Sequence, residues 1–280
     1  MKVYDNIDLY KYNTMRLHSI ARLLYAPENL EDLKEILRKY PDAHILAAGS
    51  NVILPKVLST PVVSLMSVDN RINLLDDDRV RVGCSVRIQK LIKSLQNNNL
   101  GGIEYLYSIP ASVGGLVYMN GGRGKRMNMA ISDYLEFVEY LDLNDMTIKA
   151  YNVNLTDFSY RHSPFQDMNV IILSATFRFK KQTPEVTESL IKERLDYSKR
   201  HLSADKPSCG SVFRNGNRIV YRLLRGMKEG GAMFSQKTSN WISNVDNASY
   251  DDVCKLIKRA QFLHKLLFSS CQPEVKIIKE

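Results

Sequence analysis

Short strand-like segments alternate with helical segments over the first hundred residues, and this alternation constrains the fold more than any other feature. The segment 29–40 (NLEDLKEILRKY) places its apolar residues on one helical face. The stretch AHILAAGSNVIL that follows predicts a strand, a glycine turn and a second strand, and PVVSLM, RINLLD and RVRVGCSV are typical of strands. A second helix is predicted over 86–95, and the asparagine run 97–99 ends it. The chain is therefore expected to be α+β.

The second half of the chain continues this mixture. DYLEFVEYLDL, TIKAYNV and VIILSATFRF predict further strands. One long amphipathic helix is expected from Pro184 towards Leu202, and another over 251–268. The segment 205–231 between them is rich in turn residues and is expected to form loops around a functional element.

Length and composition allow a sizeable core and give no sign of export. With 280 residues and 44% hydrophobic content, the chain has the size of two domains or one large one. No stretch approaches the ~20 consecutive apolar residues of a membrane-spanning helix, and the N-terminus lacks the basic-then-apolar pattern of a secretion signal. We therefore expect a cytoplasmic protein. The four cysteines form no CxxC pair and show no metal-ligand spacing with the histidines, so free thiols are expected and no metal site is predicted.

The net charge of +9 and the pI near 9.2 suggest an anionic partner. Nucleic acid is disfavoured, because the basic residues are spread along the chain. The densest group, Arg123, Lys125 and Arg126, lies in a glycine-rich loop without a helix-turn-helix, RNP-like or finger pattern. The alternatives are a solvated basic surface or attraction of anionic small molecules such as diphosphates and carboxylates.

Two glycine-containing segments are candidates for binding a phosphate or a flat ligand. In Ala47–Asn51 (AAGSN) a turn directly follows an apolar strand, where backbone N–H groups can surround an anion. A plain tight turn explains that segment equally well. The segment 109–122 (IPASVGGLVYMNGG) is more specific, because paired glycines twice within so short a span imply close backbone approach to something flat or charged.

A third segment, 207–215 (PSCGSVFRN), presents a serine directly after a glycine. It lacks the Gly-x-Ser-x-Gly elbow of hydrolases, and the sequence places no histidine to activate the serine. A hydrolase is therefore disfavoured.

Taken in order, these segments resemble the signatures of the MurB family of UDP-N-acetylenolpyruvoylglucosamine reductases. The matching series is AAGSN, IPASVGG with YMNGG, YRHS at 160–163, CGSVFRN, GAMFSQK and QPEV at 272–275, and the resemblance runs from about residue 13 to the C-terminus. It implies an FAD-binding module of two α+β subdomains, of the vanillyl-alcohol-oxidase (PCMH) type, plus a smaller α+β substrate domain. The implied limits are 1–182 for the FAD-binding module, with a subdomain boundary near 70–80, then 183–268 for the substrate-binding domain and 269–280 for a C-terminal strand that returns to the active site. The compact stretch 161–211 is similar to the short form of the enzyme, which lacks a substrate-clamping loop.

The resemblance also implies an activity and its residues. In the family, NADPH reduces non-covalently bound FAD, and hydride then passes to the enolpyruvyl ether of UDP-N-acetylglucosamine, which yields UDP-N-acetylmuramate for peptidoglycan synthesis. The added hydride leaves negative charge beside a carboxylate, so the site must neutralise this charge and deliver a proton. The implied catalytic residues are Ser211, as proton donor, with Arg161 and Glu274. The implied FAD contacts are Gly49, Ser50, Asn51, Pro110, Ser112, Gly114, Gly115, Asn120 and Gly121, and the implied substrate contacts are Arg214, Asn215 and Lys228.

Some positions depart from the family pattern. Ala47, Ala48 and Ala111 stand where glycines are usual, and alanine tolerates positive φ and close backbone approach less readily, so reduced FAD affinity or reshaped loops are expected.

Two other functions stay open. One is a flavoprotein oxidoreductase of the same fold that acts on another nucleotide sugar or small hydroxylated substrate, and the other is a non-catalytic nucleotide-binding protein. We expect a monomer that binds neither nucleic acid nor membrane.

Overall fold

The computed structural model describes residues 1–123 and 129–280, so Lys125 and Arg126 of the predicted basic group lie outside the described part of the chain. Its contacts divide the chain into two compact units. Unit 1 comprises Met1–Val3, Tyr25–Ala48 and Val63–Leu195, and unit 2 comprises Tyr4–Leu24, Gly49–Val62 and Asp196–Glu280. This division follows contacts in space, and the domain limits implied by the sequence stay a prediction.

Unit 1 is built on a five-stranded sheet in the order β13-β12-β14-β8-β7, in which every neighbouring pair is antiparallel. Along the central strands, side chains alternate between the two faces of the sheet, and Val82, Val138 and Ala175 on one face are fully buried. The strands are β7 (Ile72–Leu74), β8 (Arg79–Gly83), β12 (Leu135–Asp142), β13 (Ile148–Asn152) and β14 (Val170–Arg178).

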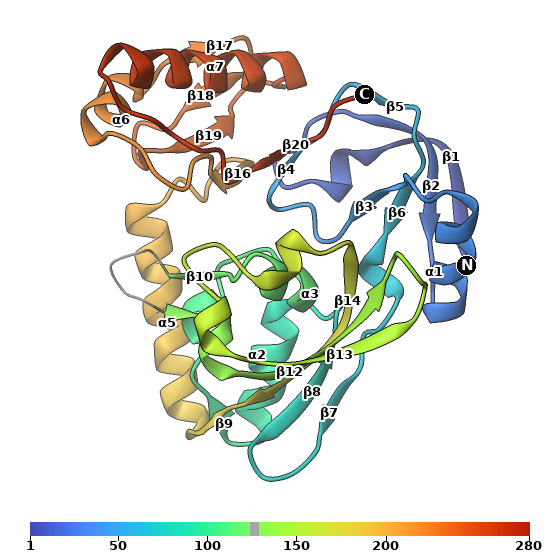
Figure 1. Cartoon of the computed structure of the whole chain (residues 1–280). Coiled ribbons are helices and arrows are strands. Elements are labelled where there is room, and N and C mark those ends of the chain that lie inside the picture. Colours follow the sequence, from blue (N-terminus) through green and yellow to red (C-terminus); the bar gives the residue numbers. More distant parts are fainter. Residues whose placement is uncertain (124–128) are drawn as a thin grey trace. The chain divides into compact units, whose positions relative to one another are not determined.

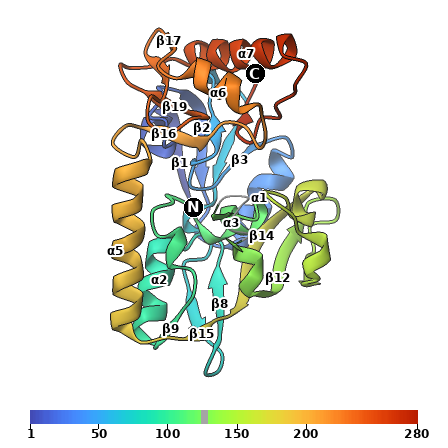
Figure 2. The same cartoon turned by 90° about the vertical axis from the view of Figure 1, so that its left-hand side faces the viewer.

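Helices cover the apolar face of this sheet. The predicted helix at 86–95 is α2 (Ile88–Asn97), and its four apolar residues at helical spacing are all buried in the core of unit 1. The six-residue helix α3 (Val113–Tyr118) also packs on the sheet, against β14 and β8. The predicted long helix is α5 (Pro184–His201), which lies beside α2 in both views (Figure 1, Figure 2) and adds Ile191 to the same core.

The remaining elements of unit 1 are short. The helix α1 (Leu30–Lys39) begins where the Asn29 side chain accepts the N–H of Asp32 at 2.9 Å, an N-cap that satisfies one of the first free donors of the helix. The short strands are β3 (His44–Leu46), β9 (Leu100–Gly101), β10 (Gly122–Arg123), β11 (Met129–Ala130) and β15 (Lys180–Lys181), while β6 (Val62–Ser64) begins in unit 2.

Unit 2 holds a four-stranded antiparallel sheet in the order β16-β19-β18-β17. The helix α7 (Tyr250–Leu266) lies across β17 and β18 (Figure 1), and α6 (Arg218–Leu224) packs beside it. Two parallel pairs, β2 with β5 and β4 with β20, belong to the same unit. Its strands are β4 (Val52–Ile53), β5 (Val57–Leu58), β16 (Ser208–Ser211), β17 (Lys228–Glu229), β18 (Ala232–Phe234), β19 (Trp241–Asn244) and β20 (Lys276–Ile277), while β1 (Lys2–Asp8) begins in unit 1 and β2 (Ile20–Ala26) ends in it.

The prediction that 205–231 forms only loops is wrong, because β16, α6 and β17 lie within it. Helix α6 has a local start signal, since the Asn217 side chain accepts the N–H of Ile219 at 2.8 Å. It spans two turns and buries Val220 and Leu224 one turn apart, which is too short a pattern to show helical periodicity. All four cysteines are free thiols, and among the described residues no helix combines the length and apolarity needed to cross a bilayer.

Candidate active site

The Gly49–Asn51 turn lies in unit 2 and is held by distant stretches of the chain. The backbone N–H of Thr14 donates to the Gly49 carbonyl at 3.0 Å, and the Thr14 hydroxyl donates to the Ser208 carbonyl at 2.7 Å. The Asn51 side-chain amide donates to the Glu274 carbonyl at 3.0 Å. These bonds fix the turn, the start of β16 and the C-terminal segment to one another.

Gly49 is required by the chain itself. Its φ is +66°, and a Cβ atom at this position would lie 1.9 Å from the Tyr12 carbonyl oxygen. Among the described residues, no hydrogen-bond acceptor is placed for the backbone N–H groups of Gly49 and Ser50. Two adjacent N–H groups in a turn with a positive φ form a suitable donor set for a phosphate.

Ser211 and Glu274 lie on neighbouring segments of unit 2. Ser211 ends β16 opposite Trp241, after Gly210, whose φ of +74° accompanies a register shift in the strand. The Glu274 N–H donates to the Val212 carbonyl at 2.7 Å, so the predicted carboxyl residue is fixed beside the residue that follows the predicted proton donor. Burial raises the pKa of the Cys209 thiol to about 12, and the negative charge of Glu274 adds to this rise.

The three predicted substrate residues are not all brought together. The Arg214 N–H donates to the Gln272 carbonyl at 2.8 Å, and the Asn215 side-chain oxygen accepts the Gln272 N–H at 2.9 Å. Both residues therefore lie against the segment that carries Glu274. Lys228 lies on β17, at the edge of the sheet opposite β16, which is roughly 14 Å away by the usual strand spacing.

Arg161 lies in a tight turn of unit 1. Ser159 and His162 exchange two backbone hydrogen bonds of 3.1 Å, which leaves Tyr160 and Arg161 in the turn. The φ of Arg161 is +58°, a conformation that costs a residue other than glycine about 1 kcal/mol or more. Its guanidinium donates to the Gly122 carbonyl at 3.0 Å and lies 5.2 Å from the centre of the Tyr160 ring. Strained backbone held in this way is common at functional sites, which favours a role for Arg161.

Asn120 braces the turn that carries Arg161. It is 4% exposed and has a φ of +42°, which asparagine tolerates better than most residues. Its side-chain amide donates to the Ser159 carbonyl at 2.9 Å, and its side-chain oxygen accepts the Ser132 N–H at a longer 3.4 Å. The structure thus brings the predicted FAD residues Asn120 and Gly121 together with Arg161.

The glycines of the segment 109–122 have a different explanation from the one that their pairing suggested. A Cβ atom on Gly114, Gly121 or Gly122 would lie 2.9, 2.4 or 2.0 Å from another atom of the protein. Gly114 and Gly122 are therefore needed for packing within the chain, and their presence is not in itself evidence for a ligand. The atom nearest to Gly121 is the end of the flexible Leu116 side chain, so packing requires a glycine there less strictly. Gly115 differs, because the nearest atom to its Cβ position is 3.5 Å away. The predicted FAD residue Ser112 caps the start of α3, where its hydroxyl accepts the Gly115 N–H at 3.5 Å.

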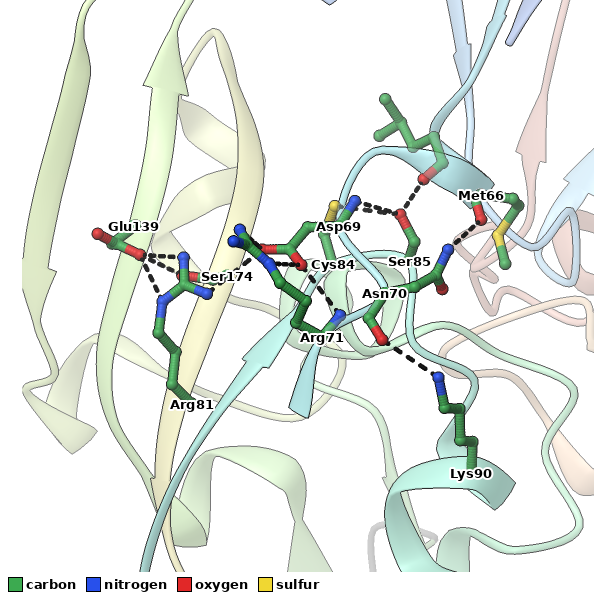
Figure 3. A network of polar contacts seen from close by, with 11 residues as sticks. Met66, Asp69, Asn70, Arg71, Arg81, Cys84, Ser85, Lys90, Glu139 and Ser174 are labelled. Carbon is green, nitrogen blue, oxygen red and sulfur yellow. Dashed lines mark hydrogen bonds and ion pairs between the residues drawn. The ribbon is translucent and has the colours of Figure 1, made fainter. Parts of the chain in front are cut away.

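A polar network in unit 1 holds the residues just after β8, against which the segment 109–122 packs (Figure 3). Asp69 accepts two side-chain hydrogen bonds of 2.9 Å from Arg71, and its backbone exchanges bonds of 3.0 and 3.1 Å with Ser85. Burial alone would raise the pKa of Asp69, but the hydrogen bonds from Arg71 outweigh it, and the pKa lies below its usual value. The Cys84 carbonyl, next to Ser85, accepts the Gly114 N–H at 3.0 Å. The network therefore holds the residue to which the predicted cofactor segment is hydrogen-bonded.

Sequence reasoning missed a cleft of about 570 Å³ beside this network. None of the predicted FAD residues lines it. Its walls come from 28–31, 67–71 and four single residues on the sheet and its edges, and no local sequence pattern links stretches so far apart. Asp69 lines the cleft but belongs to no recognisable sequence motif.

The comparisons with known proteins cover the whole chain. A family model described as an FAD binding domain matches residues 21–150, and the C-terminal domain model of UDP-N-acetylenolpyruvoylglucosamine reductase matches residues 201–278. The reductase of that name from Francisella tularensis is 34% identical and aligns over 91% of this chain and 92% of its own length. The one from Pseudothermotoga lettingae is 31% identical over 89% of this chain and 88% of its own length.

A solved structure agrees with these sequence matches. The crystal structure of UDP-N-acetylenolpyruvylglucosamine reductase (MurB) from Thermus caldophilus covers 100% of both chains, with a TM-score of 0.80 and 25% sequence identity. The predicted fold, a PCMH-type α+β FAD-binding module with a MurB C-terminal domain, is confirmed by these matches. Because relatives at least 30% identical cover about nine tenths of it, the chain belongs to the MurB family of UDP-N-acetylenolpyruvoylglucosamine reductases.

Proposed function

We propose that this chain uses NADPH and non-covalently bound FAD to reduce UDP-N-acetylglucosamine enolpyruvate to UDP-N-acetylmuramate, a precursor of peptidoglycan. The observation that carries the proposal is the bond of 2.7 Å from the Glu274 N–H to the Val212 carbonyl, because it holds a carboxyl residue beside Ser211. A site that reduces an enolpyruvyl ether needs a proton donor and a group that stabilises the developing charge, and these two residues supply both kinds of group.

The residues present fit FAD at the predicted positions. The N–H groups of Gly49 and Ser50, with the Ser50 and Asn51 side chains, form a donor set for the pyrophosphate. In unit 1 the segment from Pro110 to Gly121 contributes the contacts proposed for Ser112, Gly114, Gly115 and Asn120. FAD supplies the hydride chemistry when it is bound.

The three proposed catalytic residues divide the remaining work. Arg161 binds the substrate carboxylate, since a guanidinium forms two parallel hydrogen bonds with a carboxylate. Once hydride has been added to the methylene carbon, the adjacent carbon carries the excess charge, and the Ser211 hydroxyl donates its proton there. Glu274 stabilises the developing enolate by hydrogen bonding, which requires its carboxyl to hold a proton at that step.

Arg214 and Asn215 bind the substrate's nucleotide diphosphate in this proposal. The Asn215 oxygen is already used by Gln272, so the side-chain NH₂ group is the donor left for a phosphate. Lys228, which the family resemblance places near the same diphosphate, lies at the far edge of the sheet. A related nucleotide sugar as substrate is the second candidate, because Ala47, Ala48 and Ala111 depart from the family pattern. We further propose that the enzyme acts as a monomer in the cytoplasm.

The test is a two-step absorbance experiment on the purified protein. We expect a yellow protein whose flavin is bleached by NADPH without oxygen and regains its colour when UDP-N-acetylglucosamine enolpyruvate is added. A colourless protein that FAD cannot reconstitute contradicts cofactor binding. A reduced flavin that reoxidises with oxygen but not with the enolpyruvyl substrate supports an oxidase of the same fold instead.

A further inference from the structure

His264 is a buried histidine of α7 that the proposed reaction does not use. It is 1% exposed and packs near Phe213 and Tyr221, with ring centres 6.2 and 5.3 Å away. Its Nδ1 lies 2.7 Å from the Ala260 carbonyl oxygen, and its Nε2 accepts the Asn217 N–H at 3.0 Å. The ring therefore carries its hydrogen on Nδ1 and uses Nε2 as an acceptor, and both nitrogens have a defined partner.

The N–H that His264 accepts belongs to the segment that carries Asn215. The Tyr221 hydroxyl, beside the His264 ring, donates to the Asn215 carbonyl at 2.6 Å. Between these anchors lies Gly216, where a Cβ atom would be 2.2 Å from the Tyr221 hydroxyl and 2.7 Å from His264 Nε2. The chain thus passes directly over the two rings, and this close approach sets where the Asn215 side chain projects.

Asn215 also connects this segment to the C-terminal strand. Its side-chain oxygen accepts the Gln272 N–H at 2.9 Å, and the Arg214 N–H donates to the Gln272 carbonyl at 2.8 Å. With its carbonyl held by Tyr221 and its side-chain oxygen held by Gln272, Asn215 has one orientation for its NH₂ group. The bond from Asn217 to His264 fixes the other end of the same short segment.

We infer that His264 is a positioning residue, which acts through the Asn217 N–H to aim the Asn215 amide at the nucleotide diphosphate of the substrate. This role rests on the proposed function, because it requires Asn215 to bind substrate. A histidine that only fills space in an apolar core is replaceable by an apolar residue of similar volume. In this protein the acceptor nitrogen Nε2 is the important group, because without it the Asn217 N–H loses its partner and the segment that carries Asn215 is free to shift.

Two substitutions separate these roles. His264→Leu keeps much of the volume and removes the acceptor, whereas His264→Gln places an amide oxygen that can accept the Asn217 N–H. In the FAD-loaded enzyme we expect His264→Leu to raise KM for UDP-N-acetylglucosamine enolpyruvate about tenfold, the usual effect of one lost hydrogen bond. Its kcat and its rate of flavin reduction by NADPH should stay within about twofold. His264→Gln should restore most of the affinity.

Hydrogen exchange gives a local readout that does not depend on turnover. Backbone amides of the peptide 214–218 should exchange faster in His264→Leu than in His264→Gln or the wild type. Should His264→Leu fail to fold, Tyr221→Phe tests the same point, because it removes only the hydroxyl that donates to Asn215 and should also raise KM with little change in kcat. Equal KM values and equal exchange in the wild type and in the Leu or Phe variant would overturn the positioning role alone. Absence of turnover in the wild type would overturn the proposed function and, with it, this role.

Discussion

Replacing Asn120 with alanine tests whether one buried asparagine holds the turn that carries Arg161. The substitution removes the 2.9 Å bond to the Ser159 carbonyl and the 3.4 Å bond from the Ser132 N–H. It also places an alanine at a φ of +42°, where asparagine is tolerated better. The two changes act together, because the same residue bends the chain and braces the turn.

The magnitude follows from these contacts. A typical hydrogen bond contributes about 1 kcal/mol, and a buried partner left unsatisfied costs about 1–3 kcal/mol. The Ser159 bond has good geometry and the Ser132 bond is long, so we assign about 1–2 kcal/mol to the pair. The left-handed backbone adds about 1 kcal/mol for alanine. We therefore expect a loss of about 2–3 kcal/mol, which lowers the Tm of a chain of this size by roughly 4–12 °C.

Asn120→Gly is the matched control. Glycine also lacks the two hydrogen bonds but adopts the positive φ without strain, so it should be more stable than the alanine variant by about 1 kcal/mol. Thermal unfolding with excess FAD measures both variants, and kcat/KM with the enolpyruvyl substrate measures the effect on Arg161. If the free energy of unfolding of the alanine variant is within about 0.5 kcal/mol of the wild-type value, Asn120 does not stabilise the turn. Equal free energies of unfolding for the alanine and glycine variants would also refute the reasoning.

Three further changes test other parts of the molecule. Ser211→Ala should leave flavin reduction by NADPH nearly intact and slow flavin reoxidation by substrate at least ~100-fold in stopped-flow absorbance; equal slowing of both steps makes Ser211 a structural residue. Arg161→Lys should weaken the enolpyruvyl substrate and slow its reduction, because an ammonium does not reproduce a bidentate contact, and unchanged turnover contradicts this. Asp69 has a depressed pKa in the folded state, so its ion pair with Arg71 stabilises the protein above the unfolded pKa of about 4 and this contribution is lost as the pH falls below that value. Urea unfolding at pH 7 and pH 3.5 should show a smaller pH effect in Asp69→Asn than in the wild type.

The helices and central strands could be predicted because their signals are local. In α2 all four apolar residues at helical spacing are buried. In α7 the predicted apolar face is buried from Val253 to Ala260, but Leu267, which follows the last helical residue, is exposed, so the end of that face was predicted wrongly. The start of α5 at Pro184 follows from the tolerance of proline in the first helical turn. The ordered motifs likewise identified the family, because each motif is a short run of neighbouring residues.

What each glycine and polar side chain does was decided by contacts far apart in the sequence. Asn51 meets Glu274 across 223 positions, and Asn120 meets Ser159 across 39. Gly114 must be a glycine because Cys84 packs against it, and nothing in the motif around Gly114 distinguishes this contact from contact with a ligand. Lys228 is close to Arg214 in the sequence, yet the strand order places it at the opposite edge of the sheet from β16. Periodicity and turn chemistry act between residues a few positions apart and can be recognised in the chain, whereas strand order and the partner of a buried polar group are set by how the whole core packs.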